Sequence, residues 1–114
     1  MRVVAGKRSF STSRKCVMSP IFYVNSAPHI GHLYTAILCD ASARYERLKG
    51  NNVLFSIGTD EHGLKIQRKA IEEGMSPKDM CDKNSAVFKK MFDLCGIKYD
   101  RYIRTTDPDH RLAV

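Results

Sequence analysis

The chain has 114 residues, of which 43% are hydrophobic and 27% charged, the composition of a globular protein rather than a disordered or fibrous one. This length fits one small domain and excludes two or three full ones. No stretch approaches the run of about 18 apolar residues that a transmembrane helix requires. The formal net charge is +7. Residues 1–20 hold much of this charge, so the total does not imply a basic face for nucleic acid.

The first 15 residues are basic, rich in serine and free of acid, and the first acidic residue of the chain is Asp40. That composition is typical of a mitochondrial transit peptide. We therefore expect residues 1–15 to be a disordered targeting segment, residues 16–114 to form the domain, and the protein to work in the mitochondrial matrix. The alternative is a basic arm that binds phosphates. A secretory signal is excluded because the apolar stretch of about 7–15 residues that it needs is missing.

The four cysteines form no C-x-x-C pair, which excludes a zinc knuckle or a redox pair. Three of them, Cys39, Cys81 and Cys95, stand among apolar residues of helical spacing. We expect these three to be small buried thiols in a reducing compartment.

The hydrophobic pattern predicts strands that alternate with helices. In chain order it indicates a strand over residues 16–23 that breaks up near Pro20, a turn over 25–28, a helix over 29–49, a strand over 53–57, a loop over 58–63, helices over 64–73 and 77–94, and a strand over 97–104. The 53–57 segment is apolar on both faces, as a central parallel strand is. This order predicts an α/β fold with a parallel sheet and crossover helices.

The two later helices carry further signals. Ile66, Ala70 and Ile71 are expected to face inward from the helix over 64–73. Ser76 is expected to cap the next helix, with Pro77 in its first position.

A polar loop opens the first long helix: Pro28-His29-Ile30-Gly31-His32. Ligands of parallel sheets bind beyond the carboxyl ends of the strands. His29 and His32 point to one side of the helix start, where free backbone N–H groups attract phosphate oxygens. Gly31 lets a flat base approach. Capping or surface histidines are the alternative, and a zinc site has no third ligand at a suitable spacing.

A second polar loop, Thr59-Asp60-Glu61-His62-Gly63, gathers two carboxylates and an imidazole at the end of the next strand. One interpretation is a cap, in which Asp60 or Glu61 complements the dipole of the following helix. The other interpretation is a carboxylate that receives an ammonium group or a ribose hydroxyl.

Residues 19–35, SPIFYVNSAPHIGHLYT, resemble the first signature of the class I methionyl-tRNA synthetases. Residues 58–63, GTDEHG, and 96–100, GIKYD, match the same family in order and spacing. The H-x-G-H pattern alone is weak, because other nucleotide-binding enzymes share it, whereas the long flanking string is specific. The resemblance covers residues 16–110. It implies the first half of a Rossmann-like catalytic domain, with an incomplete parallel sheet.

The resemblance further implies a two-step reaction. Methionine and ATP, with Mg²⁺ on the triphosphate, give methionyl-adenylate and pyrophosphate. The methionyl group then passes to a tRNA. Because a mitochondrial targeting segment is predicted, we expect this tRNA to be mitochondrial tRNA(Met). We expect no protein-bound zinc and no membrane partner. The implied site comprises His29 and His32 as donors to the ATP phosphates, Gly31 beside the adenine, Ile21 and Tyr23 in the methionine pocket, and Asp60 on the ammonium group of methionine.

Several parts of that family's pattern are missing from the 114 residues: a lysine-bearing K-M-S-K-S loop, the second half of the sheet and an anticodon-binding domain. We therefore expect a truncated amino-terminal piece with little or no aminoacylation of its own and an aggregation-prone sheet edge. Two other hypotheses stay open. One is a small nucleotidylyltransferase that uses His29 and His32, and the other is a non-catalytic isoform that acts as an interaction module.

Overall fold

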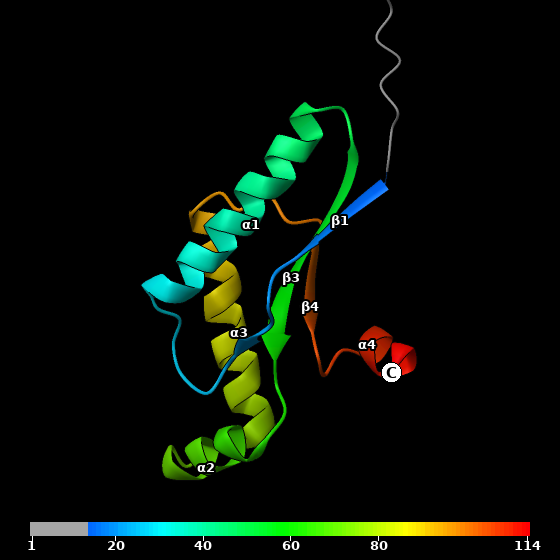
Figure 1. Ribbon diagram of the computed structural model, residues 1–114. Coiled ribbons are helices and arrows are strands. Elements are labelled where there is room, and N and C mark those ends of the chain that lie inside the picture. The colour runs from blue at the N-terminus through cyan, green and yellow to red at the C-terminus, as the bar shows by residue number, and fades with distance from the viewer. Residues whose placement is uncertain (1–13) are drawn as a thin grey trace, which may run out of the picture.

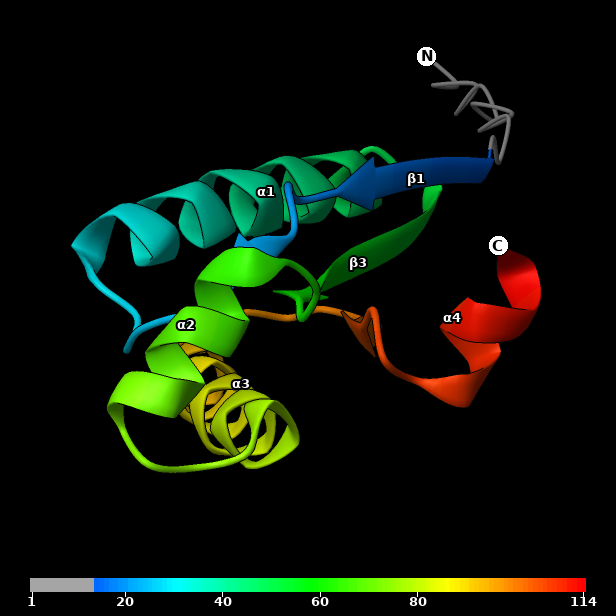
Figure 2. The same cartoon turned by 90° about the horizontal axis from the view of Figure 1, so that it is seen from below.

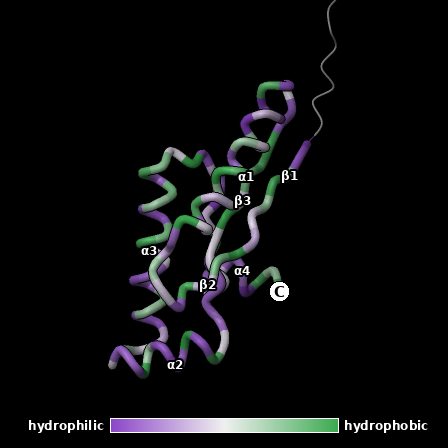
Figure 3. Tube along the Cα trace, turned by 60° about the vertical axis from the view of Figure 1, so that its left-hand side comes forward, coloured by the Kyte–Doolittle hydropathy of each residue, from purple (hydrophilic) through white to green (hydrophobic). Residues whose placement is uncertain are grey.

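The computed structural model describes residues 14–114, so most of the predicted targeting segment lies outside the described residues. The elements are β1 (Arg14–Met18), β2 (Phe22–Tyr23), α1 (Ile30–Leu48), β3 (Asn52–Asp60), α2 (Leu64–Glu72), α3 (Pro77–Leu94), β4 (Arg101–Arg104) and α4 (Pro108–Ala113). The first strand starts at Arg14, so the last two residues assigned to the targeting segment belong to the sheet. Figure 3 shows this start of β1 as hydrophilic.

The sheet is parallel and is organised around β3, as the predicted α/β class requires. β1 and β2 pair with β3 along one side, and β4 pairs along the other (Figure 1). The predicted strand over residues 16–23 is interrupted near Pro20 as expected, and the interruption divides it into two strands. Met18 pairs with Ser56 and Phe22 pairs with Thr59, so residues 19–21 hold one residue more than the facing stretch of β3. An extra residue of this kind breaks a ladder as a β-bulge does.

The helices α1 and α3 lie on the same side of the sheet, whereas α4 stands apart beyond β4 (Figures 1 and 2). Right-handed crossovers give this result when successive parallel strands are added in one direction. The core fills the space between these helices and the sheet. Its largest fully buried side chains are Phe55, Ile57, Ile66, Met80, Phe88, Phe92 and Val24.

The opposite face of the sheet has no helix over it among residues 14–114. In β3, Val53, Phe55 and Ile57 are buried, but Leu54 between them is 47% exposed. Met18 of β1 is 72% exposed. The expectation that the 53–57 strand is buried on both faces is therefore confirmed for one face only.

Burial differs from expectation at three further positions, one of which is Cys39, which is only half-buried. Ile66 and Ala70 of α2 are buried as predicted, but Ile71 is 78% exposed, because the short α2 packs mainly on α3 and has one buried face. Cys81 is buried, whereas Cys95 is exposed at the end of α3. No helix in the described part of the chain is long and apolar enough to cross a membrane.

The predicted cap of α3 is confirmed. Ser76 Oγ accepts the Asp79 N–H at 3.1 Å and donates to Asp79 Oδ2 at 2.7 Å, with Pro77 in the first turn.

We expect Ser76→Ala to lower the free energy of unfolding by about 1 kcal/mol in urea denaturation, because the Asp79 backbone N–H loses its partner. Ser42→Ala is the control: the Ser42 hydroxyl donates to Leu38 O in mid-helix, and alanine favours helix there. Equal losses would contradict the capping role.

Candidate active site

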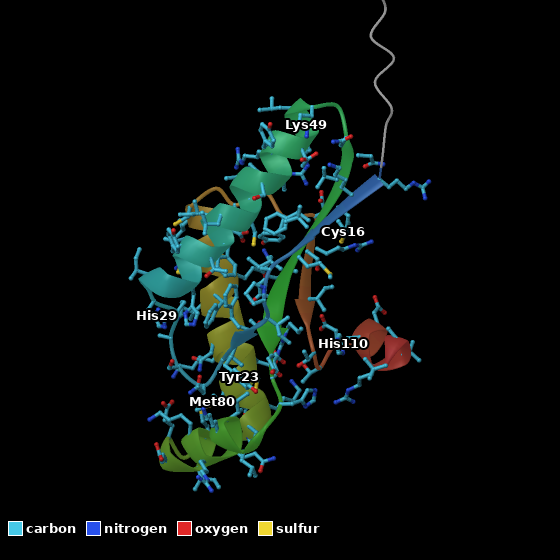
Figure 4. The ribbon with its side chains drawn as sticks, viewed as in Figure 1. Cys16, Tyr23, His29, Lys49, Met80 and His110 are labelled. Carbon is cyan, nitrogen blue, oxygen red and sulfur yellow. The ribbon has the colours of Figure 1, made fainter. Side chains whose placement is uncertain are left out.

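The two histidines cap the start of α1 reciprocally. His29 Nδ1 accepts the Gly31 N–H at 3.1 Å, and His32 Nδ1 accepts the His29 N–H at 3.2 Å. The rings stack with their centroids 3.8 Å apart, so both imidazoles point to the same side of the helix start, as predicted. Figure 4 shows His29 where the loop from β2 enters α1. These bonds occupy two backbone N–H groups that the sequence left free for phosphate.

This capping pattern determines where the protons of the neutral rings lie. Because each Nδ1 accepts a backbone N–H, the ring proton of each neutral imidazole is on Nε2. Both rings therefore present N–H donors. The first turn of α1 holds no acidic residue, and a helix N-terminus carries a partial positive charge. The helix start is thus arranged to attract an anion.

The ring of His32 is seated against two phenylalanines. Its centroid lies 5.3 Å from that of Phe22 in β2 and 4.9 Å from that of Phe88 in α3. Burial in this seat lowers the pKa of His32, and the neighbouring His29 lowers it further. The apolar seat therefore favours the neutral imidazole.

Gly31 has a second role beside the one predicted. A Cβ at this position would stand 3.0 Å from His29 Cε1 and 3.1 Å from His29 Nδ1. The His29 ring would have to give way by a few tenths of an ångström. The absence of a side chain at position 31 therefore leaves the capping ring undisturbed.

The fold brings together two of the residues expected to bind methionine. Tyr23 in β2 is the register partner of Asp60 in β3. Asp60 Oδ1 accepts the His62 N–H at 3.2 Å, which orients the carboxylate. Tyr23 and Ile21 are both 51% exposed, so they form an open surface and not a closed pocket. The loop between β2 and α1 separates Tyr23 from His29, the first residue of the histidine pair (Figure 4).

Glu61 is neither a cap nor a free carboxylate. Helix α2 begins after Gly63 without a side-chain cap, and the Glu61 side chain is fully buried. Arg104 of β4 holds it with two bonds, Nε to Oε1 at 2.6 Å and Nη2 to Oε2 at 3.0 Å. Thr59 and Thr106 also donate to it. The capping interpretation of Glu61 is therefore wrong.

Arg104 extends this cluster to α3, where its Nη2 donates to Asp82 Oδ1 at 2.5 Å. Beside it lies a cavity of about 560 Å³, lined by Glu61, His62 and Arg104 and by residues of α2, α3 and α4. None of the residues predicted to bind ATP or methionine lines this cavity. Within residues 14–114, no group of three or more His, Cys, Asp or Glu side chains is placed to hold a metal ion.

The buried ion pair predicts a loss of stability in acid. Burial by itself raises the pKa of Glu61, but hydrogen bonds from Arg104 and Thr106 outweigh it and hold the pKa below its ordinary value of 4.5. A carboxyl with a lowered pKa in the fold stabilises it above its unfolded pKa, and that contribution is lost as the pH falls below about 4.5.

We expect the free energy of unfolding to fall less steeply between neutral pH and pH about 3 in Glu61→Gln than in the wild type. Urea titrations at each pH measure this slope. Other carboxylates such as Asp82 and Asp93 also have lowered pKa values, so the wild-type slope does not vanish in the variant. Identical slopes would show that Glu61 does not titrate with folding.

Comparison with known proteins places the fold and the histidine loop in one class. The chain belongs to the class I tRNA synthetases, because the family described as tRNA synthetases class I (M) matches residues 15–114. Within this class its relatives are methionine–tRNA ligases. The chain is 53% identical over 98 residues to the probable mitochondrial enzyme of Neurospora crassa, covering 86% of this chain and 16% of that protein. It is 52% identical over 99 residues to the mitochondrial enzyme of Homo sapiens, covering 84% and 17%.

Solved structures agree with this assignment. Methionyl-tRNA synthetase of Mycobacterium tuberculosis in complex with methionyl-adenylate superposes with a TM-score of 0.87 at 44% identity, over 89% of this chain and 20% of that one. The expected Rossmann-like α/β fold of a methionyl-tRNA synthetase catalytic domain is thus confirmed. The chain spans only a small part, between 16% and 20%, of the length of these relatives.

Proposed function

We propose that these residues form the ATP- and methionine-binding part of a methionine–tRNA ligase that serves translation in the mitochondrial matrix. The carboxylate of methionine attacks the α-phosphorus of ATP, which gives methionyl-adenylate and releases pyrophosphate. The methionyl group then passes to mitochondrial tRNA(Met), and AMP leaves. One observation carries the proposal: the stacked His29–His32 pair caps α1 and presents two Nε2–H donors where an anion is favoured.

The histidines act by positioning and by electrostatic stabilisation. As the α-phosphorus is attacked, negative charge builds on the phosphate oxygens. Donors that are already in place stabilise that charge without reorganising. Mg²⁺ enters with ATP as part of the substrate and neutralises the triphosphate. The protein needs no nucleophile, because the substrate carboxylate supplies it, and holding the two substrates together accounts for much of the rate.

Methionine binds, in this proposal, at the edge formed by β2 and β3. Asp60 receives the α-ammonium group, and its orientation by the His62 N–H supports this role. Tyr23 lies beside Asp60 in the sheet and, with Ile21, offers an apolar surface for the thioether side chain. Gly31 leaves room for the adenine.

The first test separates the histidine cap from its charge. His29→Asp keeps an N-cap, because aspartate accepts backbone N–H groups well, but it sets a negative charge against phosphate. We expect the stability of the chain to change little while its affinity for ATP with Mg²⁺, measured by calorimetry, falls by about tenfold or more.

His110→Asp makes the same change of charge on α4, far from α1 (Figure 4), and serves as the control. Equal effects of the two substitutions, or no loss in His29→Asp, would contradict the proposed ATP site. Methionine-dependent exchange of pyrophosphate into ATP, measured on the whole ligase, tests the substrate, because these 114 residues alone are expected to have little or no activity. Binding of ATP that methionine never affects would favour the nucleotidylyltransferase hypothesis.

The proposed location is tested by finding the Tyr45–Arg68 peptide in the mitochondrial matrix fraction. Recovery of this peptide from the cytosol alone would contradict the matrix location.

A further inference from the structure

Helix α3 holds the loop between β2 and α1 at both of its ends. We propose that Asn84 and Phe88 of α3 are positioning residues for the histidine pair: Asn84 fixes the start of the loop at Val24, and Phe88 fixes the ring of His32 at its end. The effect on ATP binding rests on the function proposed above. The effect on the histidine rings does not.

The first anchor is a buried hydrogen bond. Asn84 Nδ2 donates to Val24 O at 2.7 Å, across 60 positions of sequence. Val24 is fully buried, and Asn84 is 9% exposed, so water does not replace this bond when it is lost. A buried carbonyl without a partner costs free energy. The chain therefore leaves β2 in one direction, set by α3.

The second anchor is the aromatic seat of His32. Phe88 follows Asn84 by four residues, so both side chains extend from the same face of α3. Phe88 is fully buried, stacks with Phe22 at 5.9 Å and contacts the His32 ring at 4.9 Å. Between the two anchors the loop passes through exposed residues, Ser26 and Ala27, that give it little support of their own.

Contacts then pass from the seat to both imidazoles. His32, held by Phe88, accepts the His29 N–H, and the His29 ring stacks on the His32 ring. A smaller residue at position 88 opens space beside His32, and the ring then reaches other rotamers and exchanges its proton between the two nitrogens. The Nε2–H donors lose their fixed direction. Sites that depend on direction lose much of their effect with small displacements.

The chain offers a matched control on the same helix. Phe92 is as fully buried as Phe88 and packs on Phe22 and Phe88, but it has no ring contact with His32 among those found in residues 14–114. Phe88→Leu and Phe92→Leu each leave a small cavity in one core and lose similar stability. A purely structural role therefore predicts equal results for the two variants.

The readout is the ¹⁵N spectrum of labelled histidines, recorded without ligand at a pH where the imidazoles are neutral. We expect the wild type and Phe92→Leu to show His32 with an unprotonated Nδ1 and a protonated Nε2. In Phe88→Leu we expect the two nitrogen shifts to move toward each other, because the proton exchanges between them. An unchanged His32 tautomer in Phe88→Leu, or the same change in Phe92→Leu, would overturn the positioning role of Phe88.

Binding supplies the second readout. We expect affinity for ATP with Mg²⁺ to fall by about tenfold in Phe88→Leu and little in Phe92→Leu. Asn84→Asp removes the donor to Val24 O without changing the size of the side chain. It should speed amide hydrogen exchange over residues 24–29 and weaken ATP binding. Unaltered amide hydrogen exchange in Asn84→Asp would overturn the positioning role of Asn84. If the wild type bound no ATP, the proposed function would fail, and the tautomer would still decide the role of Phe88.

Discussion

Gly58→Ala is expected to destabilise the sheet strongly. Gly58 lies in β3 opposite Ile103 of β4. A Cβ at position 58 would stand 1.9 Å from Ile103 O and 2.8 Å from Ile103 C. Both are backbone atoms, so β4 must move as a whole to relieve the clash. We expect a loss of about 3 kcal/mol in the free energy of unfolding, measured in urea.

Gly74→Ala is the control for this substitution. Gly74 has a φ of +67° with no atom near the added methyl group, so alanine there costs only the left-handed backbone conformation, about 1–2 kcal/mol. The amide exchange of β4 gives a second measurement, since only Gly58→Ala should expose Arg101–Arg104. Equal losses in the two variants would show that β4 adapts to the methyl group.

Arg104→Ala is expected to cost about 3–5 kcal/mol, because it leaves the buried Glu61 carboxylate without its cation. The Glu61 side chain is fully buried and Arg104 is 27% exposed, so solvent screens the pair weakly. Urea unfolding at neutral pH measures the loss. Lys89→Ala removes a cation from an exposed pair with Asp93 and should change the free energy of unfolding little.

A double substitution separates the attraction of the pair from the cost of an unpaired charge. Glu61→Leu together with Arg104→Met removes both charges, and an apolar pair of similar size often supports a fold as well as a buried ion pair does. We expect the double variant to be more stable than Arg104→Ala alone. If it were as unstable as the single variant, the loss would come from packing at position 104 and not from the stranded carboxylate.

The sequence predicts best the elements that depend on local signals. Helix α3 starts where Ser76 and Pro77 indicate, because a cap and its first turn are only a few residues apart. The pairing of His29 with His32 is likewise a property of one helical turn. The resemblance to a family also predicts the fold, since the family match extends over residues 15–114.

The rest could not be predicted because it depends on contacts across the chain. Glu61 meets Arg104 across 43 positions, and nothing in the spacing of these residues distinguishes that pair from any other acid and base. The same holds for Asn84 and Val24. The polar loop 59–63 was interpreted as a ligand site or a cap, yet one of its two carboxylates is held within the fold. Tertiary contacts decided that outcome.

Burial of apolar residues shows the same limit. The spacing of Ile71 fits the inner face of a helix, but α2 is too short and too peripheral to bury it. The break between β1 and β2 falls where it was predicted, but its register was not predicted. Pro20 indicates an interruption of the hydrogen-bond ladder, whereas the extra residue appears only when the register against β3 is known.

The parallel arrangement of the sheet has a consequence for the order in which it assembles. Each pairing joins β3 to a strand that is remote in sequence, such as Arg14 with Asn52 and Ser56 with Arg101, and parallel strands have no hairpin through which to start. At a synthesis rate of about 5–20 residues per second, β1 waits at least about two seconds before β3 is made. The helices form within microseconds. Assembly therefore depends on β3: β1 stays without a partner until β3 emerges, and β4 joins the sheet last.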